Sequence, residues 1–301
     1  MKLSLLIFLF LIITVFSGRY EELVNQINAA NAGWISKENL EFSKKTDEDL
    51  KRLFNLKIDP PENFEKTKIR REKLTDPPAN FDAREAWPGC IGGISDEGKC
   101  GSSWAIPAVE ALSDRLCIES NSTIKVRLSP QFLVDCDSYN FGCNGGWLYA
   151  AWQFLTSNGS VSIDCYPYTS GGSGEPGLCR NTCTNGSDFS FYFANDFYGV
   201  WEVYWIMTEI YLRGSIQSAF TIFEDFLHYS SGIYSHVAGN EIGGHSLRII
   251  GWGVDNGVDY WICANSWGTS WGINGYANIL KGFNECGIET TIVTGHPKVA
   301  N

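Results

Sequence analysis

This sequence contains a serine, Ser103, and a histidine, His245, whose side chains could act together to break a bond in a substrate. A serine hydroxyl becomes a useful nucleophile when a histidine takes its proton during attack. Each residue also has a simpler explanation when it is considered alone. A serine before a helical stretch is most often a helix N-cap, and a lone histidine is most often a hydrogen-bonded residue of the core. The two residues therefore need support from the sequences around them.

Four segments, in a fixed order along the chain, supply that support. They are Asp96-Glu97-Gly98-Lys99-Cys100-Gly101-Ser102-Ser103-Trp104-Ala105, Cys143-Asn144-Gly145-Gly146, Gly243-Gly244-His245-Ser246 and Asn265-Ser266-Trp267-Gly268. Together they resemble the papain family of cysteine peptidases, over roughly residues 76–300. Further matches narrow the resemblance to cathepsin B-like members. These are Phe81-Asp82-Ala83-Arg84-Glu85, Gly251-Trp252-Gly253-Val254, Cys286-Gly287-Ile288-Glu289, and Asn31 and Trp34 in a short leading segment.

The resemblance implies an α+β, papain-like fold with two lobes. One lobe is helical, the other is a β-barrel-like sheet, and the active-site cleft lies between them. The sequence itself favours helices first and strands later. It predicts helices over residues 104–117, from Ser129-Pro130, and over residues 147–155, where Asn158-Gly159 ends the last one. It predicts strands over residues 246–254 and 258–263, joined by a turn at residues 255–257.

The resemblance also assigns roles within the cleft. It implies that His245 is the general base, that Asn265 orients it, and that Trp267 shields their hydrogen bond. Gly145 and Gly146 match the backbone wall that pairs with an extended substrate. Thr291 stands where cathepsin B carries an acidic residue at the floor of its S2 pocket, so we expect no preference for a basic residue there.

Two positions depart from the family pattern, and in the family both positions take part directly in the catalytic reaction. Ser103 stands at the position of the nucleophilic cysteine, and Glu97 at that of the glutamine of the oxyanion hole. A thiol near pKa 8.5 can be converted to a resting thiolate, but a serine hydroxyl is far less acidic. A carboxylate at position 97 would face developing negative charge, and losing one oxyanion donor already costs about 10²–10³ in rate. We therefore expect impaired catalysis unless Glu97 is protonated. Considered alone, Glu97 also fits a simple surface charge of a loop.

The ten cysteines fit a disulfide framework in an oxidising compartment. The resemblance implies the pairs Cys90–Cys117, Cys100–Cys143, Cys136–Cys179 and Cys165–Cys183, and leaves Cys263 and Cys286 as free thiols. The stretch from Cys165 to Cys183 contains no histidine, whereas cathepsin B has a long occluding loop with paired histidines there. We expect a short, flexible loop and a cleft that is open on its primed side.

The chain divides into three parts. Residues 1–17 have a positive residue, an apolar run and a small terminal residue, which predict a signal peptide. Residues 18–75 hold clustered charge and no cysteine, and are interpreted as a propeptide that occupies the cleft in reverse direction. Residues 76–301 form the predicted peptidase domain. A secretory route follows, ending outside the cell or in a lysosome-like vacuole, with no membrane attachment after cleavage of the signal.

Composition limits the partners. A net charge of −11 disfavours nucleic acid. No pair of CxxC motifs is present, so we expect no metal and no cofactor. The expected partners are peptides or proteins in the cleft, the chain's own propeptide and cystatin-like inhibitors. Three functions stay open: a peptidase homologue with weak or no catalysis, an active endopeptidase that uses Ser103 with His245, and a pseudoprotease that binds peptides or partners.

Overall fold

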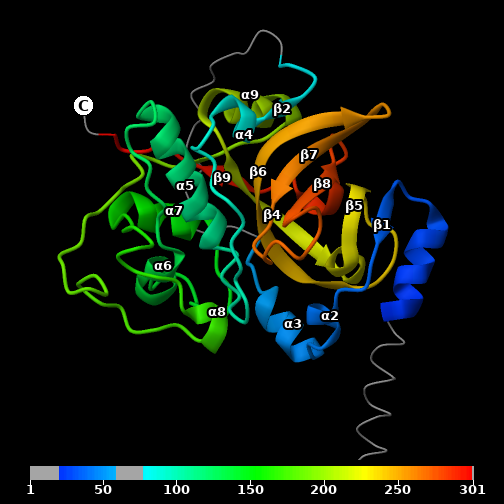
Figure 1. The fold of residues 1–301 in the computed structure, drawn as a ribbon, viewed down its shortest axis with the longest axis horizontal. Coiled ribbons are helices and arrows are strands. Elements are labelled where there is room, and N and C mark those ends of the chain that lie inside the picture. The colour runs from blue at the N-terminus through cyan, green and yellow to red at the C-terminus, as the bar shows by residue number, and fades with distance from the viewer. Residues whose placement is uncertain (1–19, 59–76, 300–301) are drawn as a thin grey trace, which may run out of the picture.

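The chain folds into two lobes with different secondary structure. The computed structural model describes residues 20–58 and 77–299. Within these residues, helices α5 to α8 make up one lobe, on the left in Figure 1, and a sheet of nine strands dominates the other. The predicted α+β, two-lobe architecture is confirmed.

The helical lobe is built on α5 (Ile106–Glu119), α6 (Pro130–Cys136), α7 (Leu148–Ser157) and α8 (Ser170–Ser173). Pro107 lies in the first turn of α5, where its missing N–H costs no helical hydrogen bond. Ser129 is the N-cap of α6, and its hydroxyl accepts a hydrogen bond from the Phe132 N–H. Helix α7 ends at Ser157, with Asn158 as its C-cap, and Gly159 follows with a φ of +72°. The predicted helix starts and ends are therefore confirmed within a few residues.

The strands of the other lobe pair in the order β1-β5-β8-β7-β6-β4-β9-β3, and β2 pairs with β6. Their bounds are β2 (Phe81–Asp82), β3 (Tyr198–Gly199), β4 (Ile216–Phe223), β5 (Tyr229–Tyr234), β6 (Glu241–Asp255), β7 (Val258–Ala264), β8 (Tyr276–Leu280) and β9 (Ile292–Thr294). Strand β6 begins earlier than predicted, because Glu241 already pairs with Phe223 of β4. The β6–β7 hairpin turns at Asn256 and Gly257, which have φ values of 49° and 80°.

Short helices complete this part of the chain. They are α4 (Ala83–Ala86), α9 (Val203–Arg213), and the 3₁₀ turns η1 (Glu224–His228) and η2 (Glu285–Gly287).

Residues 20–58, called the N-terminal segment below, run along the sheet lobe and then along the mouth between the lobes. The segment starts with a helix over residues 20–30 and continues through β1 (Trp34–Ser36), α2 (Leu40–Ser43) and α3 (Asp47–Leu53). Its helical character is as predicted, but β1 was not expected. This strand pairs antiparallel with β5, where Trp34 faces Gly232. A Cβ at Gly232 would lie 2.4 Å from the Gly33 carbonyl oxygen, so a glycine is needed for the pairing.

Gln217 of β4 joins the apolar cores of the two lobes. Its side-chain oxygen accepts a hydrogen bond from the Trp152 indole at 2.9 Å, and its amide donates to the Trp104 carbonyl at 3.0 Å. All three side chains are fully buried. A buried amide with both ends satisfied fixes the distance between the elements that carry it. The start of α5 is therefore held firmly against β4.

The described residues hold four disulfides, and they join the pairs that the family resemblance implies. These are Cys90–Cys117, Cys100–Cys143, Cys136–Cys179 and Cys165–Cys183. Cys263 and Cys286 are free, as expected, and Cys263 is buried in β7. Each disulfide is worth about 2–4 kcal/mol of stability. Cys100–Cys143 tethers the loop before α5 to the loop of Gly145 and Gly146.

Some predictions fall on other parts of the chain. The predicted signal peptide at residues 1–17 and the charged run at residues 70–73 lie outside the described residues. None of the helices in residues 20–58 and 77–299 has the length and apolar character needed to cross a bilayer.

Candidate active site

Ser103 lies at the start of the longest helix of the helical lobe. It is 2% exposed and stands just before α5. The N-cap of that helix is Ala105, whose side chain makes no capping hydrogen bond. The interpretation of Ser103 as a simple N-cap is therefore wrong. The serine is instead placed where the N–H groups and the positive end of the helix dipole of α5 can act on a bound group.

His245 lies on β6, and Asn265 follows the end of β7, the strand paired with β6. His245 Nε2 is 2.8 Å from Asn265 Oδ1. The Ser266 N–H also donates to this oxygen, so the oxygen is the acceptor and Nε2 is the donor. Burial lowers the pKa of His245 to about 4, against a smaller raising effect of the bond to Asn265. A neutral imidazole with its proton on Nε2 leaves Nδ1 as an acceptor, and this Nδ1 has no hydrogen-bond partner.

Trp267 covers this pair. Its ring centroid lies 4.9 Å from that of His245, and it is 8% exposed. Phe42 and Phe54 of the N-terminal segment pack on the same indole, at 4.7 and 5.5 Å. The aromatic cover keeps water away from the imidazole and strengthens its hydrogen bond to Asn265.

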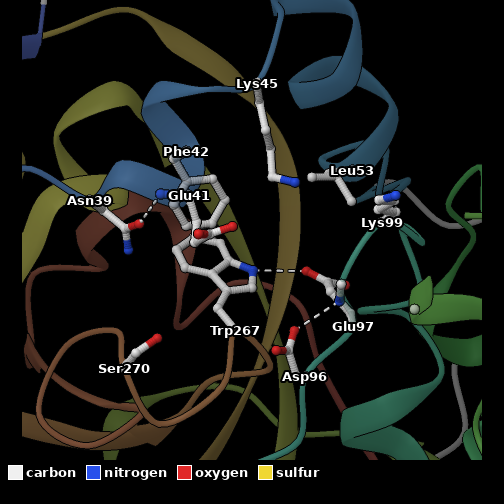
Figure 2. Close-up of a pocket in the computed structure, with 12 residues that line it drawn as sticks. Asn39, Glu41, Phe42, Lys45, Leu53, Asp96, Glu97, Lys99, Trp267 and Ser270 are labelled. Carbon is white, nitrogen blue, oxygen red and sulfur yellow. Dashed lines mark hydrogen bonds between the residues drawn. The ribbon is translucent and has the colours of Figure 1, made fainter. Parts of the chain in front are cut away.

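Glu97 is buried beside the same histidine. It is 2% exposed, and its Oε1 accepts a hydrogen bond from the Trp267 indole at 2.8 Å (Figure 2). Oε1 also lies 3.7 Å from Nδ1 of His245, whereas Oε2 has no hydrogen-bond partner. Burial raises the pKa of Glu97 well above its usual range, and the Asp96 charge adds to this, while the Trp267 indole lowers it. The interpretation of Glu97 as a surface loop charge is wrong.

Gly145, Gly146 and Gly244 line an extended binding wall. The N-terminal segment lies on it: the Gly244 N–H donates to the Phe54 carbonyl at 2.9 Å, and the Lys57 N–H donates to the Gly146 carbonyl at 2.9 Å. Both contacts between segment and wall are parallel bridges. A Cβ at Gly145 would lie 2.0 Å from the Asn55 carbonyl oxygen. The bare glycine backbone therefore lets an extended chain approach closely.

A cavity of about 470 Å³ remains open beside the wall, between the N-terminal segment and the helical lobe. Figure 2 shows Glu97 and Trp267 next to Lys45, Phe42 and Leu53 of the segment. Gly171 also lines the cavity, so the space lies on the side of the Cys165–Cys183 stretch. That stretch forms the short helix α8 rather than a flexible loop, because its Ser170 hydroxyl accepts from the buried Gln131 amide at 2.7 Å. The expectation that the processed cleft is open on its primed side stays a prediction.

Two participants were missed in the sequence. The Tyr168 hydroxyl is 2.7 Å from the Ser102 hydroxyl and donates to the Glu97 carbonyl at 3.1 Å, so it ties the loop of Glu97 to the residue before Ser103. Arg52 pairs with Glu175 at 2.5 Å, and so links the N-terminal segment to the loop after α8. A tyrosine or arginine far away in sequence gives no local signal of such a contact.

Thr291, the residue predicted at the floor of the S2 pocket, belongs to the sheet lobe. Thr291 precedes β9 and is half-buried, and its carbonyl accepts from the Ala219 N–H at 2.9 Å. His236 and His296 pair with Asp225 and Asp196, away from His245. Among the described residues no group of three His, Cys, Asp or Glu side chains is arranged to hold a metal ion.

Comparisons with known proteins agree with this geometry. The family model described as "Papain family cysteine protease" matches residues 77–296. The chain is 42% identical to Cathepsin B-like CP3 of Giardia intestinalis, over 73% of this chain and 75% of the relative. It is 36% identical to Cathepsin B-like cysteine proteinase 5 of Caenorhabditis elegans, over 93% of this chain and 91% of the relative. Among solved structures, proCathepsin B S9 from Trypanosoma congolense superimposes with a TM-score of 0.85 at 32% identity, covering 92% of this chain and 98% of that one.

Proposed function

The chain belongs to the papain family of cysteine proteases, with cathepsin B-like relatives, and we propose that it binds extended peptides but hydrolyses them poorly or not at all. The binding wall is formed and holds an extended segment of the chain itself. The two groups that would carry out hydrolysis are replaced by Ser103 and Glu97. Binding and catalysis depend on different atoms of this cleft, so one can persist without the other.

The observation that carries the proposal is the unpartnered Nδ1 of His245. A serine nucleophile needs a hydrogen bond from its hydroxyl to the base before it can lose its proton. His245 is held in place by Asn265 and Trp267, yet Nδ1 makes no hydrogen bond to Ser103. The base is therefore oriented but not engaged with the hydroxyl.

The second candidate is an endopeptidase that uses Ser103 with His245. It is favoured by the protonation state of the base, because burial lowers the pKa of His245 to about 4. A neutral imidazole is what a serine hydroxyl requires, whereas a thiolate needs an imidazolium partner. A peptide that closes the distance between hydroxyl and imidazole would turn the first candidate into the second.

The chain's route and processing are also proposed. Residues 1–17 act as a secretory signal, and residues 18–75 as a propeptide that leaves the peptidase domain of residues 76–301. The N-terminal segment buries Phe54 and Trp34, and lies on the glycine wall that a substrate would use. The four disulfides suit secretion or a lysosome-like vacuole. Cystatin-like inhibitors would bind the same open wall.

The test compares peptide binding with peptide cleavage in the processed protein. The unmodified protein and a Ser103→Ala variant are assayed with a fluorogenic peptide, and their affinity for an uncleaved peptide is measured by anisotropy. The proposal predicts that both bind the peptide with similar affinity and that their cleavage rates do not differ. Cleavage that Ser103→Ala abolishes would establish the serine-type endopeptidase instead. Absence of binding in both proteins would overturn both candidates.

A further inference from the structure

We propose that Glu97 is held as a neutral carboxylic acid whose Oε2–H is a hydrogen-bond donor for an acceptor oxygen of a ligand in the cleft. The inference rests on the proposed peptide-binding function, and deepens it by naming a group that would recognise a peptide carbonyl. It makes Glu97 a stand-in for an amide donor rather than an opposing charge. Three features of the site carry the argument: the two unequal oxygens of Glu97, the state of His245, and the charges around them.

The two carboxyl oxygens of Glu97 have different partners. Oε1 accepts the indole N–H of Trp267 at 2.8 Å, so this oxygen must present a lone pair. Oε2 is buried and has no partner among the described residues. A proton on the carboxyl group therefore belongs on Oε2. Glu97 is one of the residues that line the cavity next to Trp267, so a protonated Oε2 is an unused donor in the wall of that cavity.

The neighbouring histidine could in principle hold the proton instead. Glu97 Oε1 and His245 Nδ1 are 3.7 Å apart, which is within ion-pair range but too long for a hydrogen bond. Both side chains are buried, and neither Oε2 nor Nδ1 makes a hydrogen bond, although the nearby N–H groups of Ser102 and Ser103 would stabilise a charge on Glu97. A buried ion pair repays its desolvation only with good geometry and additional hydrogen bonds. The pair of neutral groups is therefore favoured over carboxylate and imidazolium.

Among the charged groups near the pair, Asp96 favours the same state, whereas the cations Lys45 and Lys99 would favour the carboxylate. Asp96 precedes Glu97 in the chain, and its charge further raises the pKa of Glu97. The N–H groups of Ser102 and Ser103 act in the opposite direction but with less effect than burial. Tyr168 contacts the Glu97 backbone, and burial raises the pKa of its hydroxyl, so it stays neutral. The other charged groups that line the cavity are Glu41, Lys45 and Lys99.

The consequence is a donor that depends on pH. Below the raised pKa of Glu97 the group donates a hydrogen bond to a carbonyl oxygen. Above that pKa it becomes an acceptor-only carboxylate and repels the same oxygen. The sign follows from the direction of the shift: a rise in pH removes the donor and adds a negative charge. Affinity for a peptide carbonyl should therefore fall as the pH rises.

Infrared spectroscopy on the full chain tests the protonation of Glu97 without using turnover. Spectra of the unmodified protein and of Glu97→Gln are compared at pH 7 in the carbonyl-stretching region of protonated carboxylic acids. We expect the variant to lose the absorbance of one such group. The matched control is Asp96→Asn, which removes the adjacent, exposed carboxyl. It should keep the absorbance but lose it at a lower pH, because the Asp96 charge no longer opposes ionisation of Glu97.

A second measurement uses the unmodified protein, so it does not depend on folding of a variant. The chain has four histidines, and nitrogen-15 NMR of labelled imidazoles can resolve them. We expect His245 to show an unprotonated Nδ1 down to about pH 4. A protonated Nδ1 at pH 6–7, or identical infrared spectra for Glu97→Gln and the unmodified protein, would overturn the inference. Neither readout measures cleavage, so failure here is distinct from failure of the proposed function.

Discussion

Glu97 Oε1 lies 3.7 Å from Nδ1 of His245, on the side of the imidazole that Asn265 leaves free. The residue at the proposed donor position and the proposed base are therefore direct neighbours. A change in the charge of one must alter the other, because two buried groups at this distance interact strongly. Substitutions at Ser103 and Glu97 should therefore depend on each other and on pH.

The first prediction concerns stability. Glu97→Gln replaces a buried carboxyl by an uncharged amide of the same shape. The raised pKa of Glu97 means that the folded state loses stability as the pH rises from the unfolded value of about 4.3 through the folded value. The Glu97→Gln variant does not lose this stability, because its amide does not titrate. At pH 8 we expect the variant to be more stable than the unmodified protein by at least about 1 kcal/mol in the free energy of unfolding. This difference corresponds to a melting temperature that is higher by about 2–4 °C or more.

The difference in melting temperature should shrink as the pH falls toward 4, where Glu97 is neutral in both states of the chain. Glu119→Gln is the control, since Glu119 is exposed and a change at such a residue usually shifts stability by about 0.5 kcal/mol or less. Equal melting temperatures of the Glu97→Gln variant and the unmodified protein across this range would show that Glu97 carries no penalty for burial.

The second prediction concerns attachment of the N-terminal segment. The Asn39 N–H donates to His228 Nδ1 at 3.0 Å, and the Lys37 N–H donates to the His228 carbonyl. Burial lowers the pKa of His228 to about 4. A base with a depressed pKa stabilises the docked state at high pH, and this contribution is lost as the pH falls from about 6.5 to 4. Relative to a fully exposed imidazole, the shift corresponds to about 3 kcal/mol, at about 1.4 kcal/mol for each pKa unit.

Hydrogen exchange measures this effect directly. Protection of β1 and of the Asn39 amide should fall in that pH window, because a protonated Nδ1 can no longer accept the Asn39 N–H. His228→Gln should flatten the pH dependence. His296→Gln is the matched control, since His296 pairs with Asp196 and lies just after β9, toward the other end of the strand order from β1. Equal pH dependence in the His228 variant and the unmodified protein would exclude His228 as the titrating group.

Much of the framework was readable from local sequence. Ser129-Pro130 starts α6, and Asn256-Gly257 forms the β6–β7 turn, because these residue pairs have strong backbone preferences. The disulfide pairs followed from the family resemblance rather than from spacing. What local patterns could not give was the short strand β1. Its three residues pair with β5, about two hundred residues further along the chain, and only that partner makes them a strand.

The active site, like the fold, could be predicted only in part from the sequence. The family pattern placed Ser103, Glu97 and His245 at one cleft, but the sequence alone left Glu97 open to a surface interpretation. Its burial depends on Trp267 and Tyr168, which come from distant parts of the chain. Charged residues are seldom buried without a partner, so the residue type alone predicts that Glu97 is exposed. That rule does not apply to a protonated carboxyl group, because such a group carries no charge.

The third prediction concerns the products of any cleavage. The Cys165–Cys183 stretch has no histidine and forms α8 against Gln131, so it offers no imidazole to hold a substrate's terminal carboxylate. Cleavage by the processed protein, or by a variant with restored activity, should be endoproteolytic. Mass spectrometry of a long peptide should show internal cuts, with equal rates for free and amidated C-termini. Successive loss of C-terminal dipeptides would contradict this.

The fourth prediction combines the two departures from the family pattern. Ser103→Cys supplies a thiol that can form an ion pair with His245, but at a pH above its raised pKa Glu97 is a carboxylate that opposes an oxyanion. Glu97→Gln restores a permanent donor but leaves a weak nucleophile. Each single variant should therefore recover little activity in the alkaline part of the pH range.

The double variant should recover far more than the product of the single effects, by about 10²–10³, which is the cost of losing one oxyanion donor. This coupling should shrink as the pH falls, because Glu97 becomes protonated and acts as a donor in the Ser103→Cys variant too. The measurement is kcat/KM for a fluorogenic peptide with the four processed proteins over pH 4–8. Strict additivity at every pH would show that Glu97 does not act on the reacting group. If the double variant is inert at every pH while it still binds peptide, the cleft of this chain is suited to binding alone.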